Sequence, residues 1–391
     1  MAFYSPSAGR PPAAPIPFGR LQSIDLIRGA VMILMAIDHV RVYAGLPADG
    51  QTPALFFTRW ITHFCVPVFV FTAGTSAFLY GHLLDDKRRL AVYLFTRGLL
   101  LVILEFTVIR LGWTFNMNYN EFLLAGVIWM LGCCMMLMAA LVRLKPLTVG
   151  VIGLIILTFQ QLFRLVPDLL PVSARASFGR FWEFIYTSGL EGPSGIAILY
   201  VLVPWIGVMA AGYGFGLVLL IEPKRRQRIC SWIGLSAIVI FFIVAGIIAY
   251  RQQNNVPFLF RLLNQKKYPA SQLYLLMTLG PAIALLPFAE KAKGWFSRVL
   301  IVFGRVPLFY YLLHIPLIHF SALIVNFIRT GHLHQEWYGH APFVFFYPAQ
   351  RWSLATLYLV FVVDVVLLYF MCSWYARYKQ THPGKKWLKY L

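Results

Sequence analysis

Runs of about 20 mostly apolar residues follow one another along almost the whole chain, and this is the length that an α-helix needs to cross a bilayer. Lipid offers backbone groups no hydrogen-bond partners, so such runs fold as helices that satisfy their own backbone. Only 12% of the 391 residues are charged, about half the share in soluble domains, which excludes an ordinary soluble globule. We predict an all-α, polytopic integral membrane bundle of about ten transmembrane helices, at 24–46, 57–82, 88–110, 121–143, 146–166, 196–221, 229–250, 272–290, 306–328 and 352–377.

The distribution of charge predicts how these helices are oriented. The net charge is +20, but the basic residues lie in short clusters between apolar runs, which argues against a surface for nucleic acid. Most of the 34 Lys and Arg residues fall in alternate connections and in the two tails, so the positive-inside rule predicts cytoplasmic N- and C-termini. The absence of an Asn-x-Ser/Thr sequon favours a bacterial inner membrane.

The chain is predicted to hold one folded domain. Residues 1–20 are rich in Pro and Ala and lack the apolar core of a signal peptide, so they are predicted to form a disordered cytoplasmic tail. Residues 21–391 are predicted to form a single transmembrane domain. The five cysteines show no metal-binding spacing and lie in or beside apolar runs, so no disulfide framework is expected.

The first predicted helix places ionisable residues inside an apolar span, where such residues usually mark a functional site. Arg28 and His39 are eleven residues apart, about three helical turns, so both side chains point the same way with Met32 and Met35 between them. They lie roughly 16 Å apart along the axis, which suits the two ends of an extended substrate. Asp25 precedes Arg28 by one turn, so a local ion pair is an alternative role for the arginine.

His39 is the main candidate for proton transfer or for carrying an acyl group, because imidazole titrates near neutrality and Asp38 lies beside it. The alternative is an interfacial histidine that only forms a hydrogen bond. His63 begins the second predicted span at a similar depth and could orient His39 or bind the substrate, with packing as its alternative role. The predicted catalytic residues are therefore His39, Asp38 and His63, with Asp38 or His63 orienting His39.

Further polar residues are candidates for substrate binding. His314 lies near the middle of the ninth predicted span. Arg97 lies a few turns into the third, where it could pair with Glu105 or Asp364 or hold a phosphate from the cytoplasmic side. The connection 251–271 breaks the charge rule, either because late loops are less constrained or because its cations attract an anionic or polar substrate. The predicted substrate-binding residues are Arg28, Arg97, Lys266, Lys267, Tyr268 and His314.

No metal site is predicted. Glu105 and Asp364 lie inside predicted spans and are interpreted as hydrogen-bonded structural acids. One outer segment is rich in side chains that bind metals, namely His332, His334, Glu336 and His340. Their spacing matches no zinc pattern, and histidines in loops are usually solvated.

Several stretches resemble the catalytic domain of the heparan-α-glucosaminide N-acetyltransferase family, in its bacterial branch. The resemblance covers nearly the whole chain and is carried by Arg20 to Arg41, Thr62 to Leu79, Asn264 to Ser271 with Leu279 to Pro281, Phe303 to Phe320, and Trp374 to Leu391. The spacing of Arg28 and His39 also looks like the arginine-histidine signature of the broader acyltransferase-3 group of membrane acyltransferases.

The resemblance implies transfer of an acetyl group from cytoplasmic acetyl-CoA, through the bundle, to an amino or hydroxyl group of a sugar or glycan on the outer side. Acetyl-CoA would be the donor substrate, and no bound cofactor is expected. The lysosomal enzyme of the family has its proposed active histidine in the loop before the second span, and the corresponding region here, around Pro53, has none. His39 is therefore predicted from its own position.

Two other functions stay open at this point. A small-solute transporter would bind its solute at the same buried charges, but it predicts internal repeats and broken helices in matching halves, which the sequence does not display. A noncatalytic membrane assembly protein would use the charges only to fasten helices together, and it would keep its function after the substitution His39→Ala. The sequence is compatible with an oligomer and does not specify one.

Overall fold

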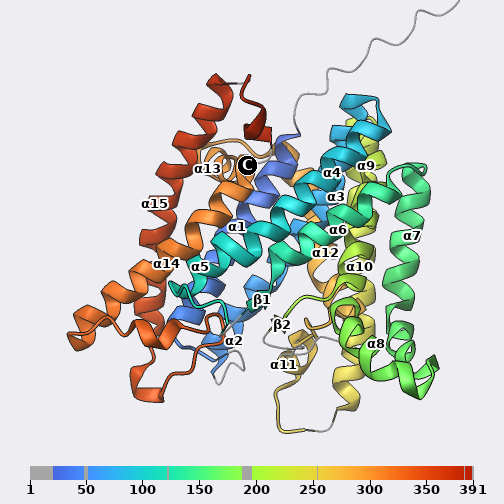
Figure 1. The fold of residues 1–391 in the computed structure, drawn as a ribbon. Coiled ribbons are helices and arrows are strands. Elements are labelled where there is room, and N and C mark those ends of the chain that lie inside the picture. The colour runs from blue at the N-terminus through green and yellow to red at the C-terminus, as the bar shows by residue number, and fades with distance from the viewer. Residues whose placement is uncertain are drawn as a thin grey trace, which may run out of the picture.

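The computed structural model describes residues 21–47, 52–120, 123–186, 196–252, 254–382 and 384–389. It is 79% helical with almost no strand, so the predicted all-α membrane fold is confirmed (Figure 1). The tail predicted at 1–20 lies outside the described residues.

The helices surround a central α1, which contacts α3, α12, α13, α14 and α15 (Figure 1). The first half of the chain forms α1 (Gln22–Tyr43), α2 (Pro53–Trp60), α3 (Cys65–Leu84), α4 (Lys87–Leu104), α5 (Arg110–Thr114), α6 (Val127–Leu141), α7 (Pro146–Phe159), α8 (Val172–Ile185) and α9 (Leu202–Leu219). The second half forms α10 (Pro223–Arg251), α11 (Phe258–Leu263), α12 (Gln272–Lys291), α13 (Trp295–Arg305), α14 (Pro307–Thr330) and α15 (Leu354–Thr381).

Short irregular helices join several of these elements. The 3₁₀ turn η1 (Ile61–Phe64) links α2 to α3, and the π-helical turn η2 (Glu105–Ile109) links α4 to α5. The remaining 3₁₀ turns are η3 (Gln160–Leu165), η4 (Pro167–Leu169), η6 (Gln335–Tyr338), η7 (Pro348–Gln350) and η8 (Lys386–Lys389).

The predicted count of about ten membrane spans is not confirmed. Among the described residues, eight segments are long and apolar enough to cross a membrane, namely Pro53–Leu84, Lys87–Thr114, Pro146–Leu165, Leu202–Leu219, Pro223–Arg251, Gln272–Lys291, Pro307–Thr330 and Leu354–Thr381. The other two predicted spans correspond to α1 and α6. Helix α1 carries charged residues at both ends, and α6 has only 15 residues.

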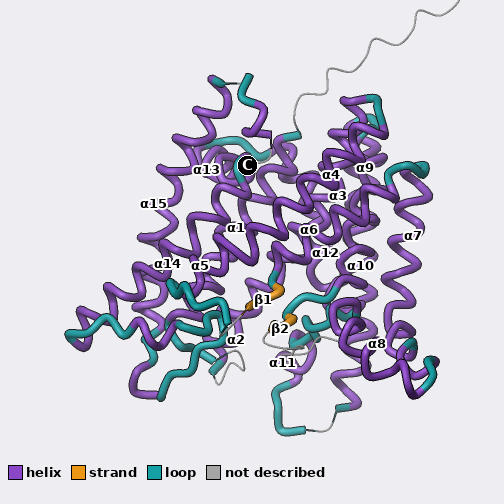
Figure 2. Tube along the Cα trace, in the orientation of Figure 1, coloured by secondary structure: helices purple, strands orange, loops and turns teal. Residues whose placement is uncertain are grey.

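Two predicted helices begin later than expected, because their first residues form a small parallel sheet. Strands β1 (Leu123–Ala125) and β2 (Ile196–Ile198) pair with Leu124 opposite Ala197, and each leads into a helix (Figure 2). The helices begin at Val127 and Leu202, later than the starts predicted near 121 and 196, and residues 121 and 122 lie outside the described part of the chain. A short apolar run has no periodicity that separates a buried strand from a helix, so the sequence pattern alone merged them.

Close helix contacts hold α1 and α3 in the bundle. A Cβ atom on Gly29 of α1 would collide with the carbonyl oxygen of Leu300 in α13, so only glycine permits this approach. Likewise, a Cβ atom on Gly74 of α3 would collide with the carbonyl oxygen of Met209 in α9. Small residues at such contacts are typical of membrane bundles, where backbones approach closely.

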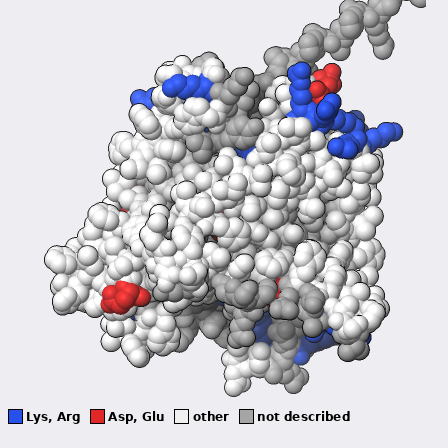
Figure 3. Space-filling view, viewed as in Figure 1, with Lys and Arg blue, Asp and Glu red and all other residues white. Residues whose placement is uncertain are grey.

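The two ends of the molecule differ from its middle. On the face drawn in Figure 3, Lys and Arg gather at both ends, and the band between them is almost free of charge. Exposed Leu, Ile and Phe side chains of α10 and α15 cover part of the middle, as expected of surfaces that face lipid. The beginning of α1 and the C-terminal end lie at one end, whereas β1, β2, α2 and α11 lie toward the other (Figure 1).

Candidate functional site

A cavity of about 630 Å³ lies beside the last turns of α1, within the size range of small-molecule sites. Its wall also includes parts of η1, α3, η2, β1 and the connections that follow α11 and η6. Polar and ionisable residues occupy much of it, namely Asp38, His39, Arg41, Arg59, Thr62, His63, Glu105, Tyr200, Lys267, Tyr268, Tyr311 and Arg351. The fold therefore brings together polar residues from both halves of the chain.

Five of the nine predicted site residues line this cavity, namely Asp38, His39, His63, Lys267 and Tyr268. The other four, Arg28, Arg97, Lys266 and His314, do not line it. All three predicted catalytic residues belong to the first group. The roles assigned to them from the sequence stay predictions, because shared surroundings alone do not establish catalysis.

His39 forms a hydrogen-bonded pair with His314 of α14. The Nδ1 atom of His39 lies 2.7 Å from Nε2 of His314, and the two rings stack with their centroids 4.8 Å apart. The edge of His39 also contacts Trp113, at 4.9 Å between ring centroids. His314 is fully buried, so it stands behind His39 and outside the cavity wall.

The partners of the pair determine which nitrogen carries each proton. Nδ1 of His314 lies 2.8 Å from the carbonyl oxygen of Tyr311 and 3.1 Å from that of Tyr310, and carbonyl oxygens only accept. His314 therefore donates from Nδ1, and its Nε2 accepts the proton that His39 donates from Nδ1. Nε2 of His39 is left without a proton or a partner among the described residues, on a ring that borders the cavity.

Asp38 is held by Arg41 and does not contact His39 through a hydrogen bond. Its Oδ1 accepts from Nε and Nη2 of Arg41 at 3.1 and 3.0 Å, while Nη1 of Arg41 donates to the carbonyl oxygen of Leu46 at 2.7 Å. The expectation that Asp38 or His63 orients His39 stays a prediction, and neither residue forms a hydrogen bond with His39 in the described part of the chain. His314 is the residue that contacts His39, because α14 packs directly against α1.

His63 is a buried histidine whose ring nitrogens are unused. It lies on η1, is 3% exposed, and neither Nδ1 nor Nε2 has a hydrogen-bond partner among the described residues. Its ring meets the ring of Tyr274 edge to face at 5.6 Å, and the Tyr274 hydroxyl donates to the His63 carbonyl oxygen. Buried polar side chains usually have hydrogen-bond partners, so the ring nitrogens of His63, which lines the cavity, are available to a ligand there.

Lys267 brings a buried positive charge to the cavity. Its Nζ lies 5.1 Å from the ring centroid of Tyr268 and 6.0 Å from that of Tyr200. Burial alone would lower the pKa of Lys267, but Tyr268 and Asp38 together raise it above its ordinary value. The ammonium group therefore stays charged at neutral pH, and it forms no ion pair with a carboxylate of the described residues.

Glu105 lines the cavity and also caps the beginning of α6. Its Oε2 accepts from the backbone N–H groups of Ile128 and Trp129, at 3.1 and 3.2 Å, in the first turn of α6. A carboxylate at the N-terminus of a helix accepts from N–H groups that have no partner within the helix, and it interacts favourably with the positive end of the helix dipole. The π-helical turn that begins at Glu105 is a feature often found near functional sites.

The predicted binding residues outside the cavity have other neighbours. Arg28 is buried and donates to Ser76 and to the carbonyl oxygen of Thr72, both in α3. Arg97 is half-buried and donates to the Tyr93 hydroxyl at 2.7 Å, and Lys266 is exposed. The substrate-binding roles of Arg28, Arg97 and Lys266 therefore stay predictions.

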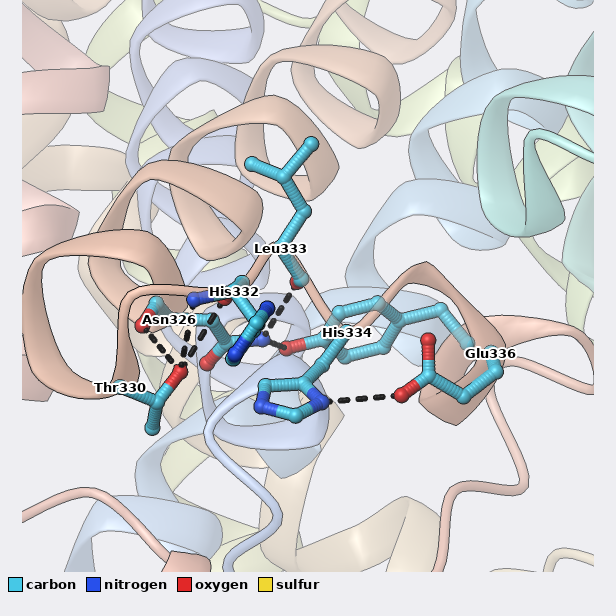
Figure 4. Close-up of polar contacts among 7 residues, drawn as sticks. Asn326, Thr330, His332, Leu333, His334 and Glu336 are labelled. Atoms are coloured by element: carbon cyan, nitrogen blue, oxygen red, sulfur yellow. Dashed lines mark hydrogen bonds and ion pairs between the residues drawn. The ribbon is translucent and has the colours of Figure 1, made fainter.

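The histidine-rich segment after α14 forms a compact loop on the surface. Nδ1 of His334 pairs with Oε1 of Glu336 at 2.9 Å, a hydrogen bond that lowers the pKa of Glu336, while Thr330 contacts the backbone of His332 (Figure 4). The described residues contain no group of three or more His, Cys, Asp or Glu side chains placed to hold a metal ion.

A match to a protein-family model assigns the chain to a family. The model described as "Heparan-alpha-glucosaminide N-acetyltransferase, catalytic" matches residues 20–246, more than half of the chain. The chain belongs to this family. Comparison with curated proteins gives no match.

Membership of the heparan-alpha-glucosaminide N-acetyltransferase family supports a membrane acetyltransferase that acts on sugars. The matched segment contains α1 and η1, with the three predicted catalytic residues. Lys267, Tyr268 and His314 lie beyond its C-terminal limit. The bacterial branch and the relation to acyltransferase-3 proteins stay predictions.

Several residues of the site, among them Arg59, Tyr200 and Arg351, were not predicted from the sequence, and neither was the contact between His39 and His314. His39 and His314 are 275 positions apart in the sequence, and no local sequence pattern predicts their contact. Tyr200 and Arg351 also lie in connections without a recognisable motif. Arg59 was detectable, because it precedes His63 by about one helical turn in the same span.

Proposed function

We propose that the protein transfers an acetyl group from acetyl-CoA to an amino or hydroxyl group of a sugar or glycan, and that the transfer takes place beside His39. The observation that supports this most is the His39–His314 pair, which leaves an unprotonated Nε2 on a ring that borders the cavity. In a chain of this family, such a nitrogen is the natural acceptor for a proton from the sugar.

His39 acts as the general base in this mechanism. Nε2 takes the proton from the acceptor's hydroxyl or amino group, whose oxygen or nitrogen attacks the thioester carbonyl carbon. The carbon–sulfur bond then breaks, CoA leaves as the thiolate, and this thiolate receives the proton from His39. A covalent relay would use the same Nε2 as the nucleophile. Labelled acetyl retained on the protein without acceptor would identify the relay.

Asp38, His63, Lys267 and Tyr268 surround the acceptor in this proposal. Asp38 and Arg41, which flank His39 in the sequence, form an ion pair in the cavity wall. The pair offers the sugar both carboxylate oxygens that accept and guanidinium N–H groups that donate. Lys267 and Tyr268 bind the polar groups of the sugar from the facing connection. His314 acts on His39 and not on the substrate.

We further propose that the end of the bundle where α1 begins and α15 ends faces the cytoplasm of a bacterium, and that the cavity serves the outer side of its inner membrane. The basic clusters at 87–89 and 224–228 support this orientation under the positive-inside rule. An apolar space of about 20 Å³ between α1, α3 and α6 adjoins the cavity at Met35 and Tyr311. It holds about one water-sized group, so acetyl-CoA arriving from the cytoplasm requires these helices to separate.

The test is turnover of acetyl-CoA by purified protein in detergent or nanodiscs, with glucosamine as acceptor. We expect CoA release by the wild type and a loss of about 10²- to 10⁴-fold in kcat for His39→Ala. His332→Ala, at an exposed histidine outside the cavity, is the matched control and keeps full activity. Folded wild type that neither binds nor turns over acetyl-CoA would refute the proposal.

A further inference from the structure

The small apolar space between α1, α3 and α6 extends the cavity beside His39 toward the middle of the bundle. Five residues line both spaces, namely Met35, Cys65, Val66, Val127 and Tyr311. Met35 precedes His39 by four residues, so it lies about one turn from His39 on the side where α1 begins. These five residues form the inner end of the cavity, which we call the junction.

The junction contains one hydrogen-bond donor without a partner among the described residues. Its methionine and two valines donate no hydrogen bonds. The Cys65 thiol already donates to the carbonyl oxygen of Val31 at 3.2 Å. The Tyr311 hydroxyl forms no hydrogen bond with a described residue, and it is not fully enclosed by protein atoms. Since Tyr311 is only 4% exposed and lines both spaces, its hydroxyl is accessible from the cavity.

Tyr311 is held next to the histidine pair. It precedes His314 by three residues in α14, and the two rings meet edge to face with their centroids 5.0 Å apart. The carbonyl oxygen of Tyr311 also accepts from Nδ1 of His314 at 2.8 Å. Because His314 in turn stacks on His39, one short stretch of α14 fixes the positions of both His39 and Tyr311.

Acetyl transfer calls for a donor of this kind. When the acceptor attacks a thioester, the carbonyl oxygen gains negative charge in a tetrahedral intermediate, and fixed hydrogen-bond donors stabilise this charge. A donor that enters the cavity from the end where α1 begins passes the junction before it reaches His39. The Tyr311 hydroxyl therefore lies on the path of the thioester.

We propose that Tyr311 is a catalytic residue whose hydroxyl donates a hydrogen bond to the thioester carbonyl oxygen. The inference rests on the proposed function, because it assigns a role in acetyl transfer. The acceptor's oxygen or nitrogen bonds to the carbonyl carbon, His39 takes the acceptor's proton, and the carbonyl oxygen becomes an oxyanion that accepts from Tyr311. The carbon–oxygen double bond then re-forms, the carbon–sulfur bond breaks, and CoA leaves as the thiolate. Tyr311 keeps its own proton throughout.

The substitution Tyr311→Phe tests this role, because it keeps the ring and removes only the hydroxyl. We expect kcat for acetyl transfer to fall about 10²- to 10³-fold, the effect of removing one oxyanion donor, while KM for acetyl-CoA stays within about twofold. Tyr375→Phe is the matched control, because it removes a buried hydroxyl without a described partner that lies outside the cavity. It keeps the wild-type kcat. An unchanged kcat in Tyr311→Phe overturns the inference.

Two ketone analogues of acetyl-CoA separate stabilisation of the intermediate from simple binding of the donor. Acetonyl-CoA carries a planar ketone, whereas the ketone of trifluoroacetonyl-CoA adds water to give a tetrahedral diol that resembles the intermediate. We expect Tyr311→Phe to weaken the binding of trifluoroacetonyl-CoA about tenfold more than that of acetonyl-CoA, with both Kd values measured by calorimetry. An equal loss for the two analogues means that Tyr311 only holds the donor, and it overturns the inference.

The same assays distinguish a failure of this inference from a failure of the proposed function. Acetyl transfer that requires His39 and does not require the Tyr311 hydroxyl keeps the proposed function and overturns the role of Tyr311. Folded wild type that transfers no acetyl group overturns both.

Discussion

Helix α1 carries polar side chains at both of its ends, Arg28 near the first and His39 near the second, and the two side chains have different surroundings. At the first end, Arg28 donates to Ser76 at 2.6 Å and to the carbonyl oxygen of Thr72 at 3.1 Å, and Asp25 lies 3.8 Å away. At the second end, His39 has one hydrogen-bond partner, His314, and a second ring nitrogen on a ring that borders the cavity. The first end is tied to its neighbours, and the second is open to a ligand.

The difference comes from packing. Gly29 and Gly304 let α1 and α13 approach until their backbones touch, so the Arg28 end leaves no space beside the helix. Near His39 the neighbours are short connections and the small sheet, which leave a cavity of about 630 Å³. A buried ionisable residue therefore marks a ligand site only where its hydrogen bonds are incomplete and space adjoins it.

Removal of the Arg28 side chain gives the largest expected effect on stability. Arg28→Met removes the buried ion pair with Asp25 and the hydrogen bonds to Thr72 and Ser76, so we expect a loss of about 3–5 kcal/mol in the free energy of unfolding. Denaturation of the purified protein in detergent, followed by circular dichroism, measures it.

The same variant tests whether the Arg28 end of α1 is purely structural. If the Arg28 end is structural, the folded fraction of Arg28→Met keeps its KM for acetyl-CoA within about twofold. A large rise in that KM would instead support the substrate-binding role predicted for Arg28 from the sequence. Arg28→Lys keeps the charge but not the planar fork, so its loss of stability should be intermediate.

Much of the fold was predictable because lipid imposes one rule on every span. Apolar runs of sufficient length gave eight of the predicted helices, and the polar ends of α1 did not prevent its recognition. The two short strands were not predictable, since Leu123–Ala125 and Ile196–Ile198 are apolar runs without a period of their own. Their pairing depends on contacts between segments about 70 residues apart.

The site was predictable only in part. The helical spacing in α1 singled out His39, and the charge rule singled out the connection that carries Lys267. Neither signal identifies the exact neighbours, because Lys266 and Lys267 are adjacent in sequence, yet only Lys267 lines the cavity. Burial and partner choice depend on tertiary packing, which a single sequence does not display.

The second prediction concerns His314, which connects the open end of α1 to α14. His314→Phe keeps a ring but removes the acceptor for Nδ1 of His39, so the imidazole loses its fixed tautomer and orientation. We expect kcat to fall about 10- to 100-fold with little change in KM. His314→Gln retains a side-chain acceptor and should recover part of the loss.

A control on the same helix separates positioning from packing. His319 is as buried as His314 and also lies outside the cavity wall, but its hydrogen-bond partners are Gly112 and Gln335 and not His39. His319→Phe should lower Tm without a shift in the pH profile of kcat, whereas His314→Phe should shift that profile. Equal pH profiles for the two variants would contradict a positioning role for His314.

The smallest expected effect on stability is at the Arg28 end of α1. Ser76→Ala removes one hydrogen bond to Arg28, while Nη2 of Arg28 keeps the carbonyl oxygen of Thr72 at 3.1 Å. We therefore expect a loss of about 1 kcal/mol in unfolding free energy and unchanged acetyl transfer. Ser23→Ala is the matched control, because the buried Ser23 hydroxyl has no partner in the described part of the chain. If Ser76→Ala lowered kcat while stability stayed constant, the Arg28 end would contribute to the reaction, and the contrast between the two ends of α1 would disappear.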